Sequence, residues 1–419
     1  MIKRHIASDI LDSLRHFPVV LLTGARQVGK STLAEMLSKT RWKAAYLTLD
    51  SRVVLDAALA DPDGFISGTP VPAIIDEVQR SPDLMRAIKG VVDRDRRPGQ
   101  FLLAGSANLM TLQKVSETLA GRVALHELQP FMWSEIAKKK PPAILRELFS
   151  AEDAGALARK WKRRTFPDRR KEIEKLIIAG GYPTLSLMKS TSARRRWFDS
   201  YRQTYIERDI RDMAAIQHLP DFGRLLSLLS FRTGQMINFS EVSREVGLPL
   251  STLKRYMDLL EVTYQIYFLR PYFVNIGKRL IKMPKLYFGD SGMACHLSAV
   301  EDWKTLERQG RVGSMVETWA ASELRKLVSL GGARYQLYFW RTYAGREVDF
   351  IIEHGDKVVA IEVKWSQSLE NSDLAGLKDC AGDLKGRHVL SVLLYPGTEL
   401  VAVDKQTIAM PFGVFFGVD

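Results

Sequence analysis

The stretch PVVLLTGARQVGKSTLAEML, residues 18 to 37, joins three features in direct succession. Residues 19 to 22 form an apolar run that is typical of a buried strand. A glycine-rich segment with the spacing GxxxxGKS follows, and apolar residues then recur at helical spacing at Leu33, Met36 and Leu37. Strand, glycine-rich loop and helix in this order indicate a phosphate-binding loop, because backbone amides and a helix N-terminus converge there on an anion. The stretch therefore predicts an α/β fold with a parallel sheet.

The loop predicts a site for ATP with Mg²⁺. Lys30 would reach the β- and γ-phosphates, and the Ser31 hydroxyl would ligate the metal ion. The alternative is a glycine-rich turn with a purely structural role. The predicted nucleotide-binding residues are Gly24, Ala25, Arg26, Gln27, Val28, Gly29, Lys30, Ser31 and Thr32.

A second apolar run ends in two acids, in VPAIIDEVQRSPDL at residues 71 to 84. Asp76 lies 45 residues after Ser31 and would hold the magnesium ion. Glu77 would polarise the water that attacks the γ-phosphate. A third run, in QFLLAGSANLM at residues 100 to 110, ends in polar residues that could sense this phosphate. Ser106 is the first candidate and Asn108 the second; the alternative is that both cap the next helix.

The motifs GARQVGKS, IIDEVQRSPDL, LLAGSANL, LAGRVALHELQPFMWSEI and IAGGYPTL occur in this order along the chain. Together they resemble a prokaryotic predicted-ATPase family, over nearly the whole length. Its members join an AAA+ module of the archaeal-ATPase type to a C-terminal domain of unknown function. The resemblance implies an ATPase.

Arg122, in the motif LAGRV, is the candidate arginine finger or γ-phosphate sensor, because the transferred phosphoryl group needs a further positive charge. If Arg122 acts from a neighbouring subunit, the protein forms a homo-oligomer. Alternatively, Arg122 closes a helix or pairs with an acid.

Composition indicates a soluble protein of two or three domains. The chain has 419 residues, of which 46% are hydrophobic and 26% charged. No apolar run approaches the ~20 residues that cross a bilayer, so no membrane association is expected. The charged N-terminus lacks a signal-peptide core, and the two cysteines, Cys295 and Cys380, lie far apart. These features predict a cytoplasmic location without disulfides.

The charge of the chain favours an anionic partner. The net charge is +13, and residues 138 to 175 alone hold 13 Lys and Arg against 6 Asp and Glu. Nucleic acid is the predicted partner, with DNA as first choice, because clustered cations release counterions from phosphates. The candidate contacts in this segment are Lys162, Arg163 and Arg164. The alternative is a solvated helical insertion.

The middle of the chain predicts a long helix followed by a winged helix. Residues 197 to 220 read as one charged amphipathic helix. In residues 236 to 270 we expect helices capped at Ser240 and Ser251, a turn at 247 to 249, and a wing at 264 to 272. Lys254 and Arg255 on the second helix would contact nucleic acid, unless the winged helix serves as a structural lid. The segment GDSGM, residues 289 to 293, lacks the last glycine of a hydrolase elbow.

The stretch REVDFIIEHGDKVVAIEVKW, residues 346 to 365, predicts two strands joined at Gly355-Asp356. This turn places Asp349 opposite Glu362 and Glu347 opposite Lys364. On period two, Val348, Phe350 and Ile352 share the other face. Like charges across a ladder repel each other, so the acids need a positive group, such as a metal ion, or the register differs.

With the helix at 313 to 327 and a strand at 336 to 343, this hairpin is similar to the PD-(D/E)XK nuclease superfamily. The resemblance implies that Glu317, Asp349 and Glu362 hold a second Mg²⁺ or Mn²⁺ and that Lys364 positions the attacking water. Hard cations on oxygen ligands suit phosphodiester hydrolysis. The superfamily also has members that bind nucleic acid without cutting it. Alternatively, Glu347 pairs with Lys364, or a bulge at Gly355 separates the acids.

The sequence as a whole predicts three regions. Residues 1–185 form an AAA+ P-loop domain with a basic helical insertion at 138–175. Residues 186–285 form a helical linker and a winged-helix-like segment, and residues 286–419 form an α/β domain like restriction endonucleases. The predicted function is Mg²⁺-dependent ATP hydrolysis coupled to nucleic-acid binding and DNA cleavage. The alternative is an ATP-dependent switch or scaffold whose C-terminal domain binds protein or DNA without catalysis.

Overall fold

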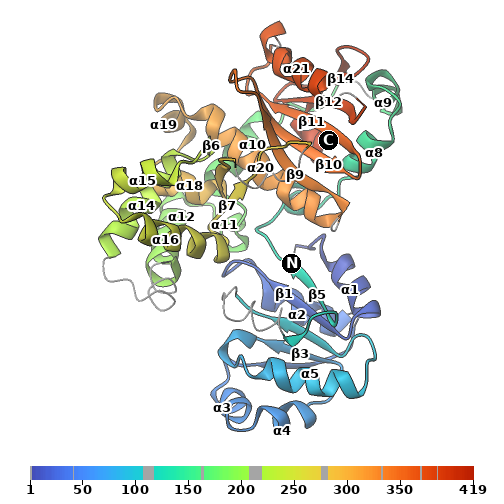
Figure 1. Ribbon diagram of the computed structural model, residues 1–419, viewed down its shortest axis with the longest axis vertical. Coiled ribbons are helices and arrows are strands. Elements are labelled where there is room, and N and C mark those ends of the chain that lie inside the picture. The colour runs from blue at the N-terminus through green and yellow to red at the C-terminus, as the bar shows by residue number, and fades with distance from the viewer. Residues whose placement is uncertain are drawn as a thin grey trace. The chain divides into compact units, whose positions relative to one another are not determined.

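The computed structural model describes residues 2–40, 42–106, 118–161, 165–206, 219–274, 282–331, 334–368, 370–384 and 386–419. The chain forms two compact units (Figure 1): Met1–Phe131 with Leu259–Gln265, and Met132–Asp258 with Ile266–Asp419. The N-terminal part of the first unit ends at Phe131, earlier than the predicted boundary at 185, because the helices that follow pack on the sheet of the second unit.

The first unit contains a five-stranded parallel sheet in the order β2-β3-β4-β1-β5. The strands that the sequence predicts before the glycine-rich loop, before the acids and before Ser106 are all present. Strands buried on both faces read as apolar runs, which is why these were detectable. The strands are β1 (Val19–Thr23), β2 (Ala45–Thr48), β3 (Ala73–Asp76), β4 (Phe101–Ala104) and β5 (Val123–Glu127).

Helices cover both faces of this sheet, as the α/β prediction requires. Val19 and Leu21 share a core with Ala58, Ile66 and Ile88, which come from the helices α3, α4 and α5. Alternate strand residues are buried on the other face, where α2 contacts β2, β3 and β4. The helices are α1 (Ala7–His16), α2 (Lys30–Thr40), α3 (Arg52–Ala60), α4 (Pro62–Ser67), η1 (Val78–Arg80) and α5 (Leu84–Arg94).

The second unit contains a six-stranded mixed sheet in the order β13-β14-β12-β11-β10-β9 (Figure 1, orange to red). The helix α20 (Val312–Leu330) precedes it, so the predicted order of one helix and three strands is confirmed. Its strands are β9 (Gln336–Arg341), β10 (Glu347–His354), β11 (Lys357–Val363), β12 (His388–Tyr395), β13 (Val401–Ala402) and β14 (Thr407–Pro411).

The hairpin of β10 and β11 has the predicted register, with Phe350 opposite Ile361. The pairing of β10 with β9, however, shifts between Val348 and Ile351. The prediction that Val348, Phe350 and Ile352 share a face is therefore wrong. Val348 packs with Ile351 in one core under α21 (Ala375–Asp383), because a bulge adds one residue between them.

The basic segment 138 to 175 belongs to the second unit. Its helix α8 (Ile144–Ser150) contacts β11 and β12, and α9 (Ala154–Lys160) contacts β13 and β14. Main-chain hydrogen bonds fix it, from Ala154 N to Lys405 O at 2.9 Å and from Phe166 N to Thr398 O at 2.7 Å. It is therefore part of the C-terminal fold and not an insertion in the ATPase unit.

The two helices expected in the winged helix are present as α15 (Phe239–Val246) and α16 (Leu250–Val262), and β7 (Ile266–Leu269) lies in the expected wing. Three further elements were not predicted, namely α14 (Leu219–Phe231), β6 (Gln235–Met236) and β8 (Lys285–Phe288). The strands form a sheet in the order β6-β8-β7. The predicted caps are wrong by one or two residues. Asn238 caps α15 by accepting from Ser240 N at 3.0 Å, and α16 begins at Leu250, ahead of Ser251.

The helix predicted from residue 197 begins earlier, as α12 (Thr191–Tyr201), and continues into a π-helical turn at Arg202–Ile206. Residues 207 to 218 of that prediction lie outside the described residues. The remaining elements are α7 (Trp133–Ile136), α10 (Arg170–Ala179), α11 (Pro183–Ser186), α18 (Ser291–Leu297), α19 (Trp303–Arg308), η4 (Asn371–Leu374) and α22 (Phe412–Phe415).

The segment GDSGM joins the start of α18 to the end of α10. Asp290 caps α18 by accepting from Met293 N at 3.0 Å, and it also accepts from Gly181 N at 2.7 Å. A Cβ atom on Gly292 would lie 2.6 Å from Gly180 N, so the two segments need glycine to approach each other. The packing of these two segments therefore explains the glycines of GDSGM and of the motif IAGGYPTL.

Within the described ranges, no helix has the length and apolar character needed to cross a membrane.

Candidate functional site

The glycine-rich loop is folded tightly around the side chain of Lys30, the first residue of α2. Lys30 is 6% exposed, and its Nζ donates to Gly24 O at 3.0 Å and to Ala25 O at 2.8 Å. Gly24 has φ +141, and a Cβ atom there would lie 2.2 Å from Leu128 O. This position therefore accepts only glycine. Burial lowers the pKa of Lys30 to about 8, although Glu77 and Asp76 act in the opposite direction.

Asp76 is the last residue of β3. It lies at the carboxyl edge of the sheet, where the glycine-rich loop also begins. Its Oδ2 accepts from the hydroxyl of Tyr46 at 2.6 Å, and its Oδ1 accepts from Glu77 N at 3.0 Å. Burial and the bond to Asp76 raise the pKa of Tyr46, while a bond to Ser31 opposes this. Ser31, Tyr46 and Asp76 are therefore neighbours. Sequence reasoning missed Tyr46, because only the pairing of β2 with β3 brings it to this acid.

Glu77 is linked to Ser106 through Gln79. Glu77 has φ +56, a left-handed conformation in which its side chain returns toward the following turn. Gln79 Nε2 donates to a carboxylate oxygen of Glu77 and to Ser106 Oγ, the latter at 3.1 Å. The sequence pointed to Glu77 and Ser106 but not to Gln79, which lies two residues after the acid. Asn108, the second sensor candidate, lies outside the described residues.

Arg122 is engaged with groups of its own unit. Its Nε donates to Asp93 Oδ1 at 2.6 Å, and its Nη1 donates to Ala120 O at 2.9 Å. The guanidinium group holds the pKa of the Asp93 carboxyl below its usual range. This contact is the alternative that the sequence left open, and the role of Arg122 as an arginine finger stays a prediction.

In the second unit, the predicted carboxylates surround the ammonium group of Lys285, from β8. Lys285 Nζ lies 2.9 Å from Glu317 Oε1 and 4.0 Å from Asp349 Oδ1, and it also pairs with Glu347. Its side chain is only 3% exposed. Tyr287 donates to the same oxygen of Glu317 at 2.5 Å. The positive group that the hairpin requires is therefore supplied, at least for these acids, by a lysine of the same chain.

The other end of the cluster contains Asp349, Glu362 and Lys364. Asp349 Oδ2 accepts from Val363 N at 2.8 Å, and Lys364 Nζ lies 3.0 Å from Glu362 Oε1. Burial raises the pKa of both carboxyl groups, and for Asp349 the neighbouring Glu362 adds to the rise. The alternative pairing of Glu347 with Lys364 is not formed, because Glu347 binds Arg341 at 2.9 Å and Lys285.

These acids do not form a ready metal site in the part of the chain that the structure describes. No three His, Cys, Asp or Glu side chains there are grouped to hold a metal ion. The Lys285 ammonium lies among the carboxylates that the resemblance assigns to the metal. One oxygen, Glu362 Oε2, is buried without a hydrogen-bond partner. A metal held by Glu317, Asp349 and Glu362 stays a prediction.

The candidate nucleic-acid contacts are only partly described. Lys254 and Arg255 are exposed on α16, and the Arg255 guanidinium lies 5.8 Å from the ring centre of Tyr256. Lys162, Arg163 and Arg164 lie outside the described residues. All five remain predictions.

Three family models match the chain. Residues 16–137 match an AAA domain, residues 170–304 match the domain of unknown function DUF8612, and residues 312–415 match the domain of unknown function DUF4143. The first match agrees with the parallel sheet and the glycine-rich loop described above. The P-loop AAA+ fold of the N-terminal part is therefore established, together with an α/β C-terminal region.

The uncharacterized protein Rv2008c of Mycobacterium tuberculosis is 30% identical over 410 residues, which cover 98% of this chain and 83% of that protein. The chain belongs to the family of Rv2008c. This chain combines the AAA-domain match and the DUF4143 match, as the predicted two-part resemblance requires. A nuclease character of the C-terminal part is not among these findings.

Two solved structures are also similar. The Thermotoga maritima RuvB Holliday junction branch migration motor is 15% identical, with a TM-score of 0.30, over 64% of this chain and 89% of that chain. AMPPCP-bound DnaA from Aquifex aeolicus is 10% identical, with a TM-score of 0.28, over 61% of this chain and 86% of that chain. With scores this low, the fold assignment rests on the sheet order and the AAA-domain match.

Proposed function

We propose that this chain is a magnesium-dependent ATPase whose nucleotide state controls the binding of nucleic acid, with DNA as first choice, by its second unit. The proposal rests on one observation above all. Lys30, Ser31, Asp76 and Glu77 gather at the carboxyl edge of one parallel sheet, which is where open α/β sheets bind ligands.

Each of these side chains has a part in the proposed reaction. Lys30 would leave the carbonyl oxygens of Gly24 and Ala25 and bind the phosphates, whose charge offers a stronger partner. Ser31 and Asp76 would hold Mg²⁺, which when bound offsets the charge of the phosphate oxygens. Glu77 would orient the attacking water.

Gln79 would fix the orientation of the Glu77 carboxylate. Its amide holds Glu77 and Ser106 together, so a change at the phosphate that moves Ser106 would also move the acid. Gln79 is thus a positioning residue in this proposal.

Two kinds of partner are proposed, nucleic acid because of the charge of the chain and a second copy of the chain because of Arg122. A net charge of +13 and the exposed Lys254 and Arg255 support nucleic acid. A homo-oligomer is required if Arg122 completes the site of a neighbouring subunit. We also assign the chain to the cytoplasm, in line with its free cysteines Cys295 and Cys380.

For the second unit we favour binding without cleavage. Lys285 already offers positive charge to Glu317, Glu347 and Asp349, and a salt-bridged face is what a binding domain would have. The second candidate is DNA cleavage with Mg²⁺ or Mn²⁺ held by Glu317, Asp349 and Glu362 and with Lys364 beside it. The buried, unpartnered Oε2 of Glu362 is the observation in its favour.

The ATPase proposal is tested by Lys30→Ala, measured as phosphate release with ATP and Mg²⁺. We expect turnover to fall by about 10³-fold or more, because the charge that follows the transferred phosphoryl group is lost. Lys39→Ala is the matched control, since Lys39 is exposed on the same helix and pairs with Glu35 at the surface. Unchanged turnover in Lys30→Ala would remove the assignment of the loop.

Cleavage is tested with plasmid DNA, Mn²⁺ and the pair of wild type and Glu362→Gln. We expect no cutting by either protein and equal ATP turnover by both. Cutting by the wild type that Glu362→Gln abolishes, with ATP turnover intact, would establish the nuclease and overturn the binding-only assignment.

A further inference from the structure

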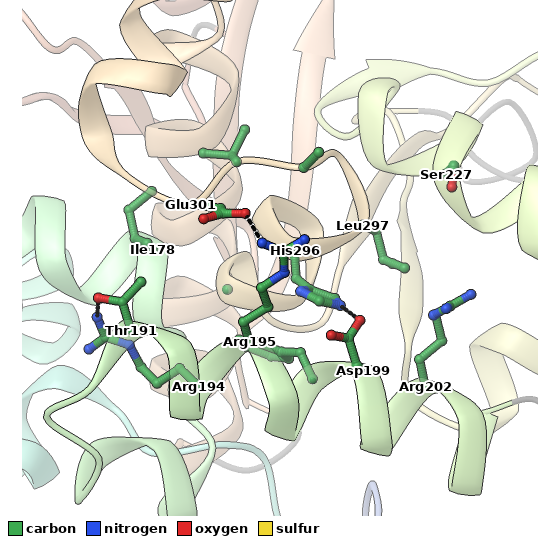
Figure 2. Close-up of a pocket in the computed structure, with 14 residues that line it drawn as sticks. Ile178, Thr191, Arg194, Arg195, Asp199, Arg202, Ser227, His296, Leu297 and Glu301 are labelled. Carbon is green, nitrogen blue, oxygen red and sulfur yellow. Dashed lines mark hydrogen bonds and ion pairs between the residues drawn. The ribbon is translucent and has the colours of Figure 1, made fainter.

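The second unit contains a polar cavity of about 290 Å³ that the proposed function does not use (Figure 2). Its walls come from α10, α12, α14 and the segment from α18 to residue 301. A cavity of this size accommodates a small molecule or the end of a longer one. The whole cavity belongs to the second unit and lies within residues 170–304, the range of DUF8612.

One helix supplies most of the charge. The residues of α12 and of the turn after it that line the cavity recur at spacings of three and four, so they lie on one helical face. Figure 2 shows Arg195 and Asp199 reaching from this helix to Glu301 and His296, whereas Arg194 bends back to Thr191. The six residues are Thr191, Arg194, Arg195, Phe198, Asp199 and Arg202.

The facing wall holds these side chains in place. His296 Nε2, on α18, lies 3.2 Å from Asp199 Oδ1, and its ring stacks on Phe198 with centroids 5.2 Å apart. Glu301 pairs with Arg195 (Figure 2). The helix thus presents three arginines and one aspartate against a wall that contributes one carboxylate and one imidazole.

Arg194 and Arg195 have partners that a phosphate group can replace. Arg194 donates to a neutral hydroxyl, Thr191 Oγ1, at 3.2 Å. The pair of Arg195 and Glu301 is 61% and 54% exposed, and ion pairs so exposed contribute little stability. Phosphate oxygens that accept from a guanidinium fork form shorter and stronger bonds than a hydroxyl does.

The rest of the lining suits a ligand with an apolar part. Ile178, Leu297 and Val300 line the cavity together with the ring of Phe198. A free inorganic anion would leave this surface without a contact, whereas a phosphorylated sugar or nucleotide would cover it.

We propose that this cavity binds a phosphomonoester, with Arg194 and Arg195 holding the phosphate group. Two sources carry this chemistry, namely a free mononucleotide and the 5′-phosphorylated end of a DNA strand. The site is separate from the glycine-rich loop and uses none of its residues.

The test compares a short fluorescein-labelled thymidine oligonucleotide that bears a 5′-phosphate with the same strand bearing a 5′-hydroxyl. Binding is measured by fluorescence anisotropy on the full chain carrying Lys30→Ala, so that the glycine-rich loop contributes no phosphate site. We expect the phosphorylated strand to bind about tenfold more tightly, because charge-assisted bonds from arginine are added. Arg194→Gln in this background should reduce the preference to about twofold or less.

Arg196→Gln is the matched control, since Arg196 is exposed on the same helix but does not line the cavity. It should keep the full preference. The proposal is overturned if the Lys30→Ala chain shows no preference, or if Arg194→Gln and Arg196→Gln reduce it equally. Normal ATP turnover by Arg194→Gln in the chain with Lys30 intact would show that the variant is folded.

The two sources are then separated by competition with unlabelled thymidine 5′-monophosphate. Competition as strong as that by the unlabelled phosphorylated strand assigns the site to free mononucleotides. Competition at least about tenfold weaker assigns it to strand ends, because additional backbone contacts then contribute. Failure of both ligands to compete with the labelled strand contradicts the proposal.

Discussion

At the scale of single residues, Lys30 combines deep burial with a charge that the proposed ligand requires. Without nucleotide its Nζ is satisfied by two carbonyl oxygens, and its pKa falls to about 8 because of burial. A bound triphosphate would favour the charged form and raise this pKa. Lys30 should therefore take up a proton when ATP binds at mildly alkaline pH.

This uptake is measurable by titration calorimetry in buffers of different ionisation enthalpy. With a pKa of about 8 in the free protein, we expect an uptake of about 0.9 proton at pH 9 and about 0.1 at pH 7. The sign follows because the free side chain is neutral above its pKa, while the bound one is protonated. Lys30→Arg is the control, since arginine stays charged throughout. Equal uptake at both pH values would contradict the low pKa.

A second prediction at this scale concerns Gln79. Gln79→Ala should lower the kcat for ATP by about 10- to 100-fold with little change in KM, because Glu77 loses the amide that orients it. Arg80→Ala is the neighbouring control, since Arg80 pairs with Asp50 at the surface. A raised KM at unchanged kcat would show that Gln79 helps to bind nucleotide and does not position the acid.

Candidate site residues could be named from the sequence only where a motif singles them out. The spacing of the glycines pointed to Lys30 and Ser31, and the end of an apolar run pointed to Asp76 and Glu77; their roles stay predictions. No motif marks Tyr46, because its hydrogen bond to Asp76 depends on the pairing of β2 with β3. Gln79 stands inside the predicted motif, but its link to Ser106 depends on the left-handed backbone at Glu77.

At the scale of secondary-structure elements, the C-terminal hairpin shows what a local pattern determines. The turn at Gly355 sets the register, and Phe350 pairs with Ile361 as predicted. The bulge lies in the pairing of β10 with β9, outside the hairpin of β10 and β11, and the sequence of the hairpin does not predict it. Nor could the hairpin reveal Lys285, which comes from β8 of another sheet.

Lys285 is expected to stabilise this part of the fold by compensating buried acids. Lys285→Met should destabilise the second unit by about 3–5 kcal/mol at pH 7.5, because carboxylates are left without their cation. The stability lost through this substitution should shrink as pH falls, because burial raises the pKa of Asp349 in the folded state. At lower pH the folded chain then binds more protons than the unfolded chain, which stabilises the fold.

Thermal unfolding at pH 7.5 and pH 5.5 measures this effect. Lys282→Met is the control, since Lys282 is exposed three residues before β8 and lies over the ring of Tyr343. A Lys285→Met protein as stable as the control at both pH values would exclude the compensating role.

At the scale of the whole molecule, the proposed oligomer makes a prediction about mixtures. Arg122→Ala should reduce turnover by about 10³-fold if the side chain acts as an arginine finger. Lys30→Ala and Arg122→Ala, each inactive alone, should regain activity when mixed if Arg122 serves a neighbouring subunit. The measurement is phosphate release as a function of the mixing ratio.

The control is Asp93→Ala, which frees Arg122 from its present partner and should keep turnover within about twofold of the wild type. A mixture that stays inactive would place Arg122 in its own subunit, where it pairs with Asp93. Normal turnover by the Arg122→Ala protein would show that Arg122 has only a structural role.

The division of the whole chain was the hardest feature to predict. The parallel-sheet unit and the mixed-sheet unit follow from patterns along their own strands. The placement of residues 138 to 175 does not, because it depends on contacts such as Phe166 N to Thr398 O, more than two hundred residues apart. Basic composition suggested a surface insertion, yet its apolar residues, including Leu148 and Leu157, are buried.

Because Lys285 lies between carboxylates, the residue type at position 285 is informative when homologous chains are compared. A homologue that keeps the acids at 317, 349 and 362 but has a short uncharged residue at 285 would lack the lysine that compensates the acids at 317 and 349. Such natural variants are the ones to screen for divalent-ion uptake and strand scission. Chains with lysine there should group with binding domains, so a sequence survey can choose its experiments before any protein is purified.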